Sequence, residues 1–500
     1  MNILLINVPS RRGKGGFTLP LGLIYVGAII ERSGHNAKIY DPYLDDVELR
    51  DLDNNFDTLD KIIEYYKPSI IGFGGIATSY GRTKKLSFHI KNKYPEIFQI
   101  VGGALSSTYE LLLTRTKIDV VFHGETEISL PKLLTKYEQN EPYYDIEGIS
   151  FFLNGKIIKN PSVEQIRDLD TIPLPSYHLI DLRQYLVNIN DWINQYNILH
   201  DNNYVEILKK INGNKNYIPI VTSRGCTHKC LFCYRHVRGI RQHSVSYVVR
   251  HLKYLKQIYG IEGFQFCDEL FNSNPEWVLK YCNAIDRENL NIFYLISGAR
   301  VDKISEVMLN RLRETGCIEI NYGQESGSDT ILKEYNKGVS SEKNKEITLL
   351  TKRKGIHCPV QIVIGSPSEI TNTIYETVQF LKDVDAYQYS LNYLIPLPET
   401  QIWKYVENNQ LINDVEQYLD LVSEHGGNSL INLTEVSERE WRNWKYHIMK
   451  EMKLYYYKKK KRMLYYFFYF LFNTISISIL YRFSKYIPVR LKKIIKKLLW

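Results

Sequence analysis

Three cysteines stand close together near the middle of the chain, and their spacing is suited to metal binding. Cys226, Cys230 and Cys233 form the pattern C-x-x-x-C-x-x-C. Thiolates are soft ligands that bind iron–sulfur clusters or zinc. Structural zinc usually takes four protein ligands, and no second pair of Cys or His stands nearby at finger spacing. The triplet therefore predicts an iron–sulfur cluster with one iron open to a small ligand, and a zinc module is the alternative.

A repeating strand–helix pattern positions this triplet. The apolar run at residues 218–223 ends just before Cys226, as expected of a strand that leads into a loop. Five more strand candidates follow, with helical stretches between them. Six such units indicate a partial (β/α)6 barrel of the TIM-like kind, which keeps its functional residues at the carboxyl ends of its strands. The later strand candidates are residues 263–267, 291–297, 317–322, 357–364 and 387–394.

A second alternating pattern fills residues 1–145. Short apolar runs alternate with helical stretches, and several of the runs end in glycines. Repeated units of this size predict a doubly wound, Rossmann-like parallel sheet. The dinucleotide pattern G-x-G-x-x-G is missing after the first run, which disfavours NAD.

The chain is therefore predicted to be an α/β protein with four parts. These are a Rossmann-like domain at residues 1–145, a connector at 146–215, a barrel at 216–420 and a helical C-terminal region at 421–500. Within the connector, residues 149–159 are predicted to form a hairpin.

The composition excludes some classes of function. The chain has seven cysteines, an odd number, and it opens on a strand pattern rather than a secretory signal. A reducing cytosol is therefore favoured over a disulfide framework, and the four cysteines outside the triplet are expected in the core. Residues 451–500 hold ten Lys and three Arg against one Glu, so the net charge of +9 belongs to the tail. Nothing in the remaining charge pattern indicates nucleic-acid binding.

The cysteine segment resembles the C-x-x-x-C-x-aromatic-C loop of the radical S-adenosylmethionine (SAM) superfamily, and the resemblance extends over about residues 216–400. It implies that Cys226, Cys230 and Cys233 ligate a 4Fe–4S cluster whose open iron chelates the SAM amino and carboxylate groups. An external one-electron reductant such as flavodoxin or ferredoxin would supply the electron that splits SAM into methionine and a 5′-deoxyadenosyl radical.

The same resemblance assigns SAM-binding roles to successive strand ends. Asp268 is matched to the carboxylate that receives the SAM amino group, and Arg300 to the residue that meets the SAM carboxylate. Glu325 is matched to the residue that binds the ribose hydroxyls. Taken singly, each is better explained as a helix cap or a surface ion pair, and it is their order at successive strand ends that favours a binding site. The neighbouring residues included in the predicted SAM site are Phe232, Ser297, Ser326 and Gly365, of which the last belongs to the turn near adenine.

Residues 20–41 resemble the opening of the cobalamin-binding domain that precedes the barrel in one large radical SAM class, which includes many methyltransferases. Gly74, Gly75, Gly102 and Gly103, at two strand ends, match that domain too, and glycines there let a bulky ligand approach the backbone. The resemblance implies bound cobalamin. The D-x-H-x-x-G motif is missing, as it generally is in this class. Ala104-Leu105 follow the glycine pair where Pro-His is frequent.

The C-terminal tail has a membrane-binding pattern. Residues 463–481 are uncharged and follow a basic run, and the basic segment at 488–500 is amphipathic in helical spacing. Such segments suit the anionic surface of a bilayer. The prediction is a cytoplasmic protein that contacts the cytoplasmic face of a membrane, and a buried C-terminal helix is the alternative.

Together these features predict a cobalamin-dependent radical SAM enzyme that methylates a carbon atom of a small-molecule or lipid-linked substrate. Radical SAM cyclisation, rearrangement or oxidation without methyl transfer is the first alternative. A non-catalytic, membrane-bound cobalamin or SAM sensor is the second, and an open cluster iron argues against it because a sensor has no need of one.

Overall fold

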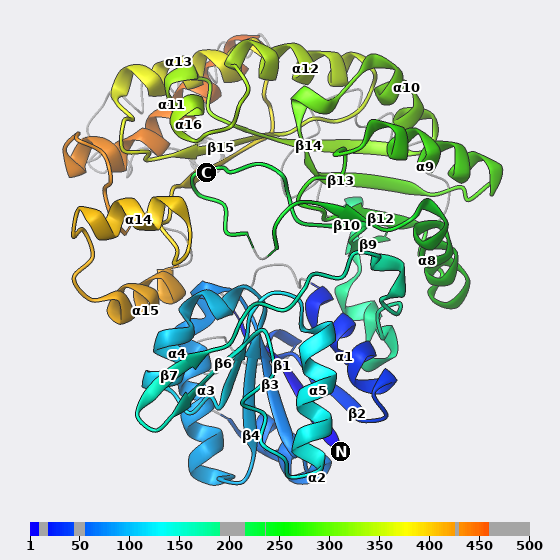
Figure 1. The fold of residues 1–500 in the computed structure, drawn as a ribbon. Helices are drawn as coiled ribbons and strands as arrows, with labels where there is room; N and C mark the ends of the chain where they lie inside the picture. The colour runs from blue at the N-terminus through cyan, green and yellow to red at the C-terminus, as the bar shows by residue number, and fades with distance from the viewer. Residues whose placement is uncertain (10–18, 45–55, 191–215, 236, 426–429, 460–500) are drawn as a thin grey trace, which may run out of the picture.

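The computed structural model describes residues 1–9, 19–44, 56–190, 216–235, 237–425 and 430–459. These residues form two α/β domains, drawn one above the other in Figure 1. Each domain is built around a seven-stranded sheet. The predicted tail segments at 463–481 and 488–500 lie outside the described residues.

The N-terminal sheet has the order β2-β1-β3-β4-β5-β6-β7. Its first five strands run parallel. The central strands are apolar and buried because helices cover both faces of the sheet. The strands are β1 (Asn2–Asn7), β2 (Asn36–Tyr40), β3 (Ile70–Gly74), β4 (Phe98–Gly102) and β5 (Val120–Phe122), and the helices are α1 (Leu21–Arg32), α2 (Asp57–Tyr66), α3 (Tyr80–Lys93), α4 (Tyr109–Arg115) and α5 (Thr126–Glu138).

The second sheet has the order β16-β15-β14-β13-β12-β9-β8. Its six long strands are parallel, which confirms the six predicted barrel units. In Figure 1 the sheet curves and its helices lie on the outer side. The strands are β9 (Asn216–Ile220), β12 (Gly263–Phe266), β13 (Phe293–Ala299), β14 (Cys317–Glu325), β15 (Val360–Ile364) and β16 (Tyr389–Tyr393), and the helices are α8 (Val245–Tyr259), α9 (Pro275–Arg287), α10 (Glu306–Glu314), α11 (Asp329–Glu334), α12 (Ser341–Arg353) and α13 (Thr371–Asp383).

The predicted connector is divided between the two domains. Its first part forms the expected hairpin, β6 (Ile149–Leu153) and β7 (Lys156–Lys159), which extends the N-terminal sheet in antiparallel fashion. Further along, β8 (Val187–Asn188) pairs with β9 at the edge of the barrel sheet. Residues 191–215 lie outside the described part of the chain. The segment therefore joins the two sheets through hydrogen bonds rather than standing as a separate unit.

The chain after the barrel returns to the N-terminal domain. Helices α14 (Gln401–Asn408) and α15 (Val415–His425) descend beside the barrel in Figure 1. Tyr418, Leu419 and Val422 of α15 share a buried apolar cluster with Tyr80 and other N-terminal residues. The boundary predicted at residue 421 therefore falls inside a helix that belongs to the packing between the domains.

The last described helix, α16 (Glu438–Lys459), covers β15 and β16 with Trp441 and Trp444. Among the described residues, no helix is both long and apolar enough to cross a membrane.

Replacement of Leu419 by Ala tests the contact between α15 and the N-terminal domain. Leu419 is fully buried, so Leu419→Ala is expected to cost about 2–5 kcal/mol through lost burial and the cavity that remains. Leu421 on the same helix is 39% exposed, and Leu421→Ala is expected to change stability by less than about 0.5 kcal/mol. Thermal unfolding of both variants measures the difference. Equal shifts would contradict the packing of α15 described above.

Candidate functional site

The cysteine loop leaves the barrel sheet at the carboxyl end of β9. Two short strands, β10 (Ser223–Arg224) and β11 (Arg241–Gln242), pair at its base, and Cys226 forms a bridge with Arg238. Gly225 has φ +85°, and a Cβ there would lie 2.4 Å from the carbonyl oxygen of Gly239. Only glycine fits this close approach of the two sides of the loop. The two sides of the loop are therefore joined at its base, and its cysteines lie beyond the ends of the strands.

The three cysteines are free thiols and interact electrostatically. A hydrogen bond with Cys233, together with the nearby charges of Lys337 and Arg300, lowers the pKa of the Cys230 thiol to about 6 against the opposing effect of burial. The same hydrogen bond raises the pKa of Cys233. Burial raises the pKa of Cys226. A thiol that ionises readily is prepared to bind a soft metal.

The donor set fits an iron–sulfur cluster. Within the described parts of the chain, no three His, Cys, Asp or Glu side chains are grouped so that they could hold a metal ion. A cluster spreads its cysteine ligands over separate irons, so it does not require the sulfur atoms to surround a common point. This arrangement gives no support to the zinc alternative, whereas Cys226, Cys230 and Cys233 have the chemistry for three cluster corners.

Asp268 has a different environment from the one expected of a SAM ligand. Its side chain is buried, and its carboxylate accepts hydrogen bonds from Thr222 N at 2.8 Å and from Ser223 Oγ at 2.6 Å. Burial raises the pKa of Asp268 to about 6, against the hydrogen bonds that lower it. These contacts fix the end of β9 and the base of the cysteine loop. We therefore assign Asp268 to support of the loop.

Glu269, the next residue, faces the interior cavity. It lines the cavity between the domains, and its charge is among the influences that raise the pKa of Cys226 after burial. Burial and the neighbouring Asp268 also raise the pKa of Glu269 itself. A carboxylate beside the cluster loop and open to the cavity is placed to receive the SAM amino group. We accordingly propose Glu269 for the role that the sequence suggested for Asp268.

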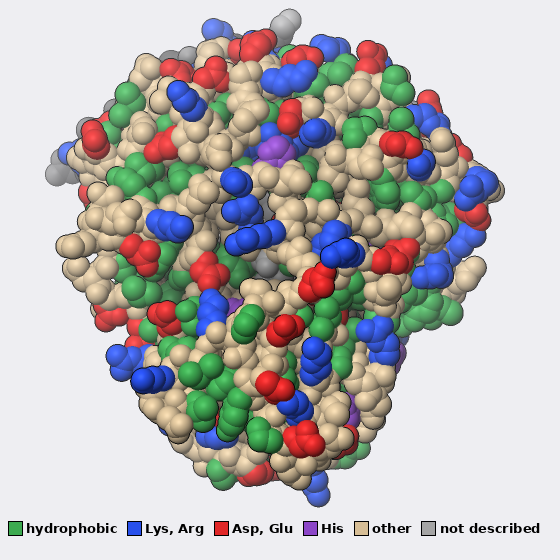
Figure 2. Space-filling model, in the orientation of Figure 1, with side chains coloured by type: hydrophobic (Ala, Val, Ile, Leu, Met, Phe, Trp, Pro, Cys, Tyr) green, Lys and Arg blue, Asp and Glu red, His purple; other side chains and the backbone are tan. Residues whose placement is uncertain are grey.

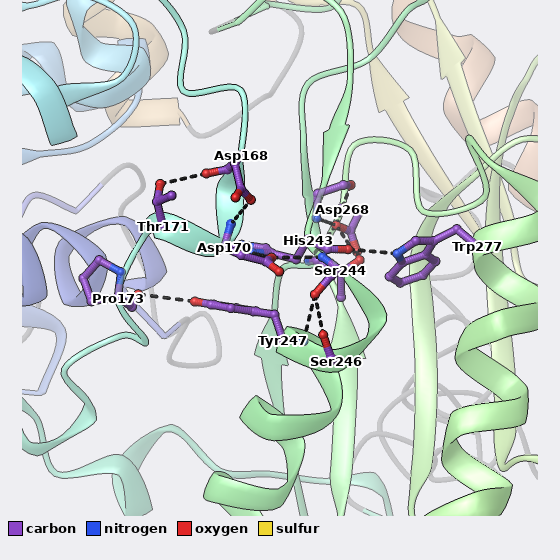
Figure 3. Close-up of polar contacts among 12 residues, drawn as sticks. Asp168, Asp170, Thr171, Pro173, His243, Ser244, Ser246, Tyr247, Asp268 and Trp277 are labelled. Atoms are coloured by element: carbon purple, nitrogen blue, oxygen red, sulfur yellow. Dashed lines mark hydrogen bonds and ion pairs between the residues drawn. The ribbon is translucent and has the colours of Figure 1, made fainter.

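A second polar network supports the same strand end from the connector. Asp170 Oδ1 lies 3.1 Å from His243 Nδ1, and the amide of His243 donates to Thr222 O at 2.9 Å. Figure 3 shows His243 close to Asp268 and Asp170, with Trp277 donating to the carbonyl of His243. Burial lowers the pKa of His243 to about 4, although Asp170 opposes this. The connector and the barrel therefore hold the loop base from both sides.

The other predicted SAM residues lie along the carboxyl edge of the barrel. Arg300 is buried, and its guanidinium donates to Asp302 Oδ1 at 2.8 Å and to Lys337 O at 2.6 Å. Ser297 Oγ accepts from Gln265 Nε2 at 2.6 Å. Arg300 is thus held next to the cysteine loop, and Ser297 is positioned by the neighbouring strand. Both positions are compatible with the predicted roles.

Glu325 and the residues near it form the next part of this edge. Glu325 ends β14 with φ +64°, a strained backbone for a residue with a side chain, and its carboxylate pairs with Lys337 at 3.3 Å. Ser326 Oγ lies 3.2 Å from Thr377 Oγ1. The amide of Gly365 donates to the buried Glu369 carboxylate.

Phe232 supports the loop rather than lining the cavity between the domains. Its ring packs edge-on against Tyr335, with 5.1 Å between ring centroids. It also joins an apolar cluster around Leu394 and Ile402. The aromatic residue of the cysteine motif therefore anchors the loop to the barrel.

A cavity of about 540 Å³ lies between the two domains. Its N-terminal wall includes Gly74, Gly75, Gly102 and Gly103, the four glycines singled out by the sequence, and Gly103 has φ +72°. Its barrel wall includes Ser223, Arg224, Gly225, Cys267 and Glu269. Cys267 is thus a cavity residue, whereas Cys282, Cys317 and Cys358 are buried as expected.

The cavity wall fits a flat, bulky cofactor. A Cβ added at Gly22 or Gly124 would meet no protein atom within 4 Å, so both positions open onto free space. The wall is mostly apolar, and its charged residues are Glu125 and Glu127 on the N-terminal side and Arg224 and Glu269 on the barrel side. Such a surface suits the corrin face of cobalamin. Figure 2 shows Lys and Arg side chains around the hollow where the two domains meet.

Four charged residues that the sequence argument did not assign connect the domains at this cavity. Arg224 lies 3.0 Å from Glu125 Oε1 and 2.6 Å from Glu127 Oε1, and Arg241 lies 2.7 Å from Glu125 Oε2. Burial raises the pKa of Glu125, but Arg241 and Arg224 outweigh it, so the pKa is lowered. The sequence signals were limited to the position of Arg224 within the cysteine motif and that of Glu125 after Gly124 at the end of an apolar run. The partners of Arg224 are about 100 residues away in the sequence.

Comparisons with known proteins agree with this geometry. The radical SAM superfamily profile matches residues 220–381, and the B12-binding domain profile matches residues 14–134. An uncharacterized methyltransferase of Pyrococcus horikoshii is 28% identical over 82% of this chain and 84% of its own length. The anaerobic magnesium-protoporphyrin IX monomethyl ester cyclase of Synechocystis sp. is 24% identical over 71% of this chain and 67% of its own.

A solved structure shares the fold. The radical SAM methyltransferase TsrM from Kitasatospora setae, with cobalamin and a [4Fe-4S] cluster bound, gives a TM-score of 0.63 at 18% identity. The match covers 82% of this chain and 78% of that one. The two matched profiles imply the cofactors, which are a 4Fe–4S cluster and SAM for the barrel and cobalamin for the N-terminal domain.

Single substitutions test the cluster ligands. Each of Cys226→Ser, Cys230→Ser and Cys233→Ser is expected to lower iron from about four atoms per chain to near zero after anaerobic reconstitution. Cys267→Ser is the matched control, because Cys267 lines the cavity without belonging to the loop motif. Iron and sulfide analysis with visible absorbance measures the result. Loss of iron in the Cys267 variant alone would contradict the assignment.

Paired substitutions separate the roles of Asp268 and Glu269. Glu269→Gln is expected to weaken SAM binding about 10-fold or more with unchanged thermal stability, because a charged hydrogen bond contributes about 1.5–3 kcal/mol. Asp268→Asn is expected to lower the thermal midpoint and the yield of cluster, because it replaces one carboxylate oxygen by an amide donor and removes the negative charge that the Thr222 and Ser223 donors stabilise. Calorimetric titration with SAM and thermal unfolding distinguish the two. The reverse pattern would restore Asp268 as the SAM ligand.

Proposed function

We propose that this chain, which belongs to the radical SAM superfamily and carries a B12-binding domain ahead of its barrel, is a cobalamin-dependent methyltransferase that acts on a carbon atom. When bound, the cluster and SAM supply a radical that removes a hydrogen atom from the substrate, and cobalamin supplies the methyl group. The protein's own task is to hold these components at one cavity and to position the substrate carbon between them.

The observation that carries the proposal is the composition of the cavity wall. One side is the glycine edge of the N-terminal sheet, and the other is the base of the cysteine loop with Glu269. A cofactor lying on Gly102 and Gly103 would therefore face the SAM-binding side of the barrel across the same space. A cavity shared in this way favours direct transfer between two cofactors over radical chemistry at the barrel alone.

The charged residues of the site would orient SAM. Glu269 is open to the cavity and suits the amino group, and Arg300 is a buried cation next to the loop that suits the carboxylate. Glu325 would bind the ribose hydroxyls. The ion pairs of Arg224 with Glu125 and Glu127 would fix the distance between the two walls.

The relatives' names support methyl transfer and also one alternative. The Pyrococcus horikoshii relative is named a methyltransferase, whereas the Synechocystis relative is named a cyclase. Cyclisation or oxidation without methyl transfer is therefore the second candidate function. It requires SAM cleavage, but it does not require SAM as a methyl donor.

The substrate is proposed to be a small molecule or a lipid-linked one. The lipid-linked form follows from the basic, aromatic tail beyond residue 460, which suits the anionic face of a membrane. A one-electron reductant of the flavodoxin or ferredoxin type is the proposed protein partner.

Product analysis tests methyl transfer against the alternative. With reductant, cobalamin and a small-molecule extract as the substrate source, a methyltransferase forms 5′-deoxyadenosine and S-adenosylhomocysteine in about equal amounts, because SAM has two roles. Methyl-labelled SAM then labels the product. 5′-Deoxyadenosine without S-adenosylhomocysteine or label would favour the cyclase-like function. No SAM cleavage by a chain with a reduced cluster would favour the sensor.

The corrinoid content of a cavity variant provides the structural control. Gly22→Leu places a side chain where no protein atom lies within 4 Å, so it should fill the cavity without disturbing the fold. We expect it to abolish corrinoid binding and S-adenosylhomocysteine formation while iron content is kept, and Gly22→Ala to retain both. Normal corrinoid content in the leucine variant would contradict the placement of cobalamin.

A further inference from the structure

The turn after α11 lies directly against the cysteine loop. Leu231 N donates to Tyr335 O at 3.0 Å, and Asn336 Nδ2 donates to Lys229 O at 2.9 Å. These two hydrogen bonds flank Cys230 in the sequence. The turn at residues 335–337 therefore fixes the loop on both sides of one predicted cluster ligand.

Lys337, the last residue of this turn, places a positive charge inside the barrel. Its exposed fraction is 7%, and its Nζ lies 3.3 Å from Oε1 of Glu325, which is itself 8% exposed. A Cβ on Gly323 would lie 2.5 Å from that carboxylate oxygen and 3.0 Å from the lysine nitrogen. The pair thus packs against bare backbone of β14, where a side chain would displace it. A lysine buried this deeply is rare unless it is paired.

The position of the turn is held by Arg300 as well. Its guanidinium donates to the carbonyl oxygen of Lys337 at 2.6 Å, so the turn, the loop and the third strand end are linked. Lys337 directly follows the two residues that hydrogen-bond to the loop on either side of Cys230, so its charge is held close to this predicted ligand. A buried charge acts through a low dielectric, whereas water and salt screen an exposed one.

We propose that Lys337 is a positioning residue whose ammonium group holds Glu325 in place for the SAM ribose and stabilises the reduced form of the cluster. Reduction adds one negative charge to the cluster, and a fixed cation beside it favours that form. Glu325 partly offsets the positive charge of Lys337, so the two residues together set the reduction potential of the cluster. The inference rests on the proposed cluster site at the three cysteines and does not depend on methyl transfer.

Redox titration of the anaerobically reconstituted full chain tests the effect on the cluster. In the absence of SAM, Lys337→Met is expected to shift the midpoint potential of the cluster to a more negative value. The electron paramagnetic resonance signal of the reduced cluster measures this potential. Lys333→Met is the matched control, because Lys333 lies one turn earlier in α11, carries the same charge and is exposed. Its potential should equal that of the unmodified chain.

Variants of the partner give an effect of opposite sign. Glu325→Gln removes the negative charge and should shift the potential to a less negative value. The double variant Glu325→Gln with Lys337→Met should return it toward the starting value, since the pair is then removed together. Both single variants should weaken SAM binding about tenfold, which corresponds to about 1.4 kcal/mol. Damage to the fold would not give shifts of opposite sign.

Iron content separates the possible failures. An unmodified chain without iron would refute the cluster site itself. If the cluster binds, an unchanged potential in Lys337→Met, or an equal shift in Lys333→Met, would overturn the role of Lys337. If Lys337→Met does not retain its cluster, Glu325→Gln decides the question. A less negative potential in that variant supports the proposal, and any other result overturns it.

Discussion

The buried carboxylate of Asp268 fixes the part of the chain on which the whole site depends. Its hydrogen bonds to Thr222 and Ser223 reach from the end of one barrel strand to the end of the next. The cysteine loop begins two residues later, so a small change at this point would move all three thiols. An unpaired buried carboxylate is costly, and the backbone amide and hydroxyl donors offset that cost. The base of the loop is therefore held in place by the hydrogen bonds that satisfy this buried acceptor.

The second constraint is that the carboxyl ends of the parallel strands in both domains open onto one cavity. Parallel strands gather their loops at a single edge, and both domains direct this edge inward. The N-terminal edge contributes glycines, because a bulky cofactor needs bare backbone. The barrel edge contributes charged and thiol groups, because SAM and iron need ligands. The chemistry of each wall thus follows from what it has to approach.

The sequence predicted the elements whose signals are local. The cysteine spacing, the six strand–helix units and the glycines at strand ends are patterns within short stretches, and all three found their expected places in the fold. The roles of Asp268 and Glu269 were harder to separate, because both follow the same strand. The directions of the two side chains distinguish their roles, and only the hydrogen bonds of Thr222 and Ser223 to Asp268 reveal these directions.

Long-range contacts carried no sequence signal at all. Lys337 pairs with Glu325 from beyond α11, 12 residues along the chain, and Glu416 reaches Tyr80 and Lys84 across more than 300 residues. The division of the connector between two sheets was hidden for the same reason, because strand pairing depends on the partner. These features arise from tertiary packing, which a single sequence does not express as a pattern.

Two of the attachments between the domains explain why the cavity can serve transfer between cofactors. At the cavity itself, Arg224 is bound to Glu125 and Glu127 of the N-terminal domain. On the other side, α15 places Leu419 in the N-terminal core and pairs Glu416 with Lys84. Opening the domains would expose buried apolar surface at α15 and leave the nearly buried Glu125 without its cations. Both costs oppose separation of the walls, so the distance between the glycine edge and the cysteine loop is set by the fold rather than by the ligand.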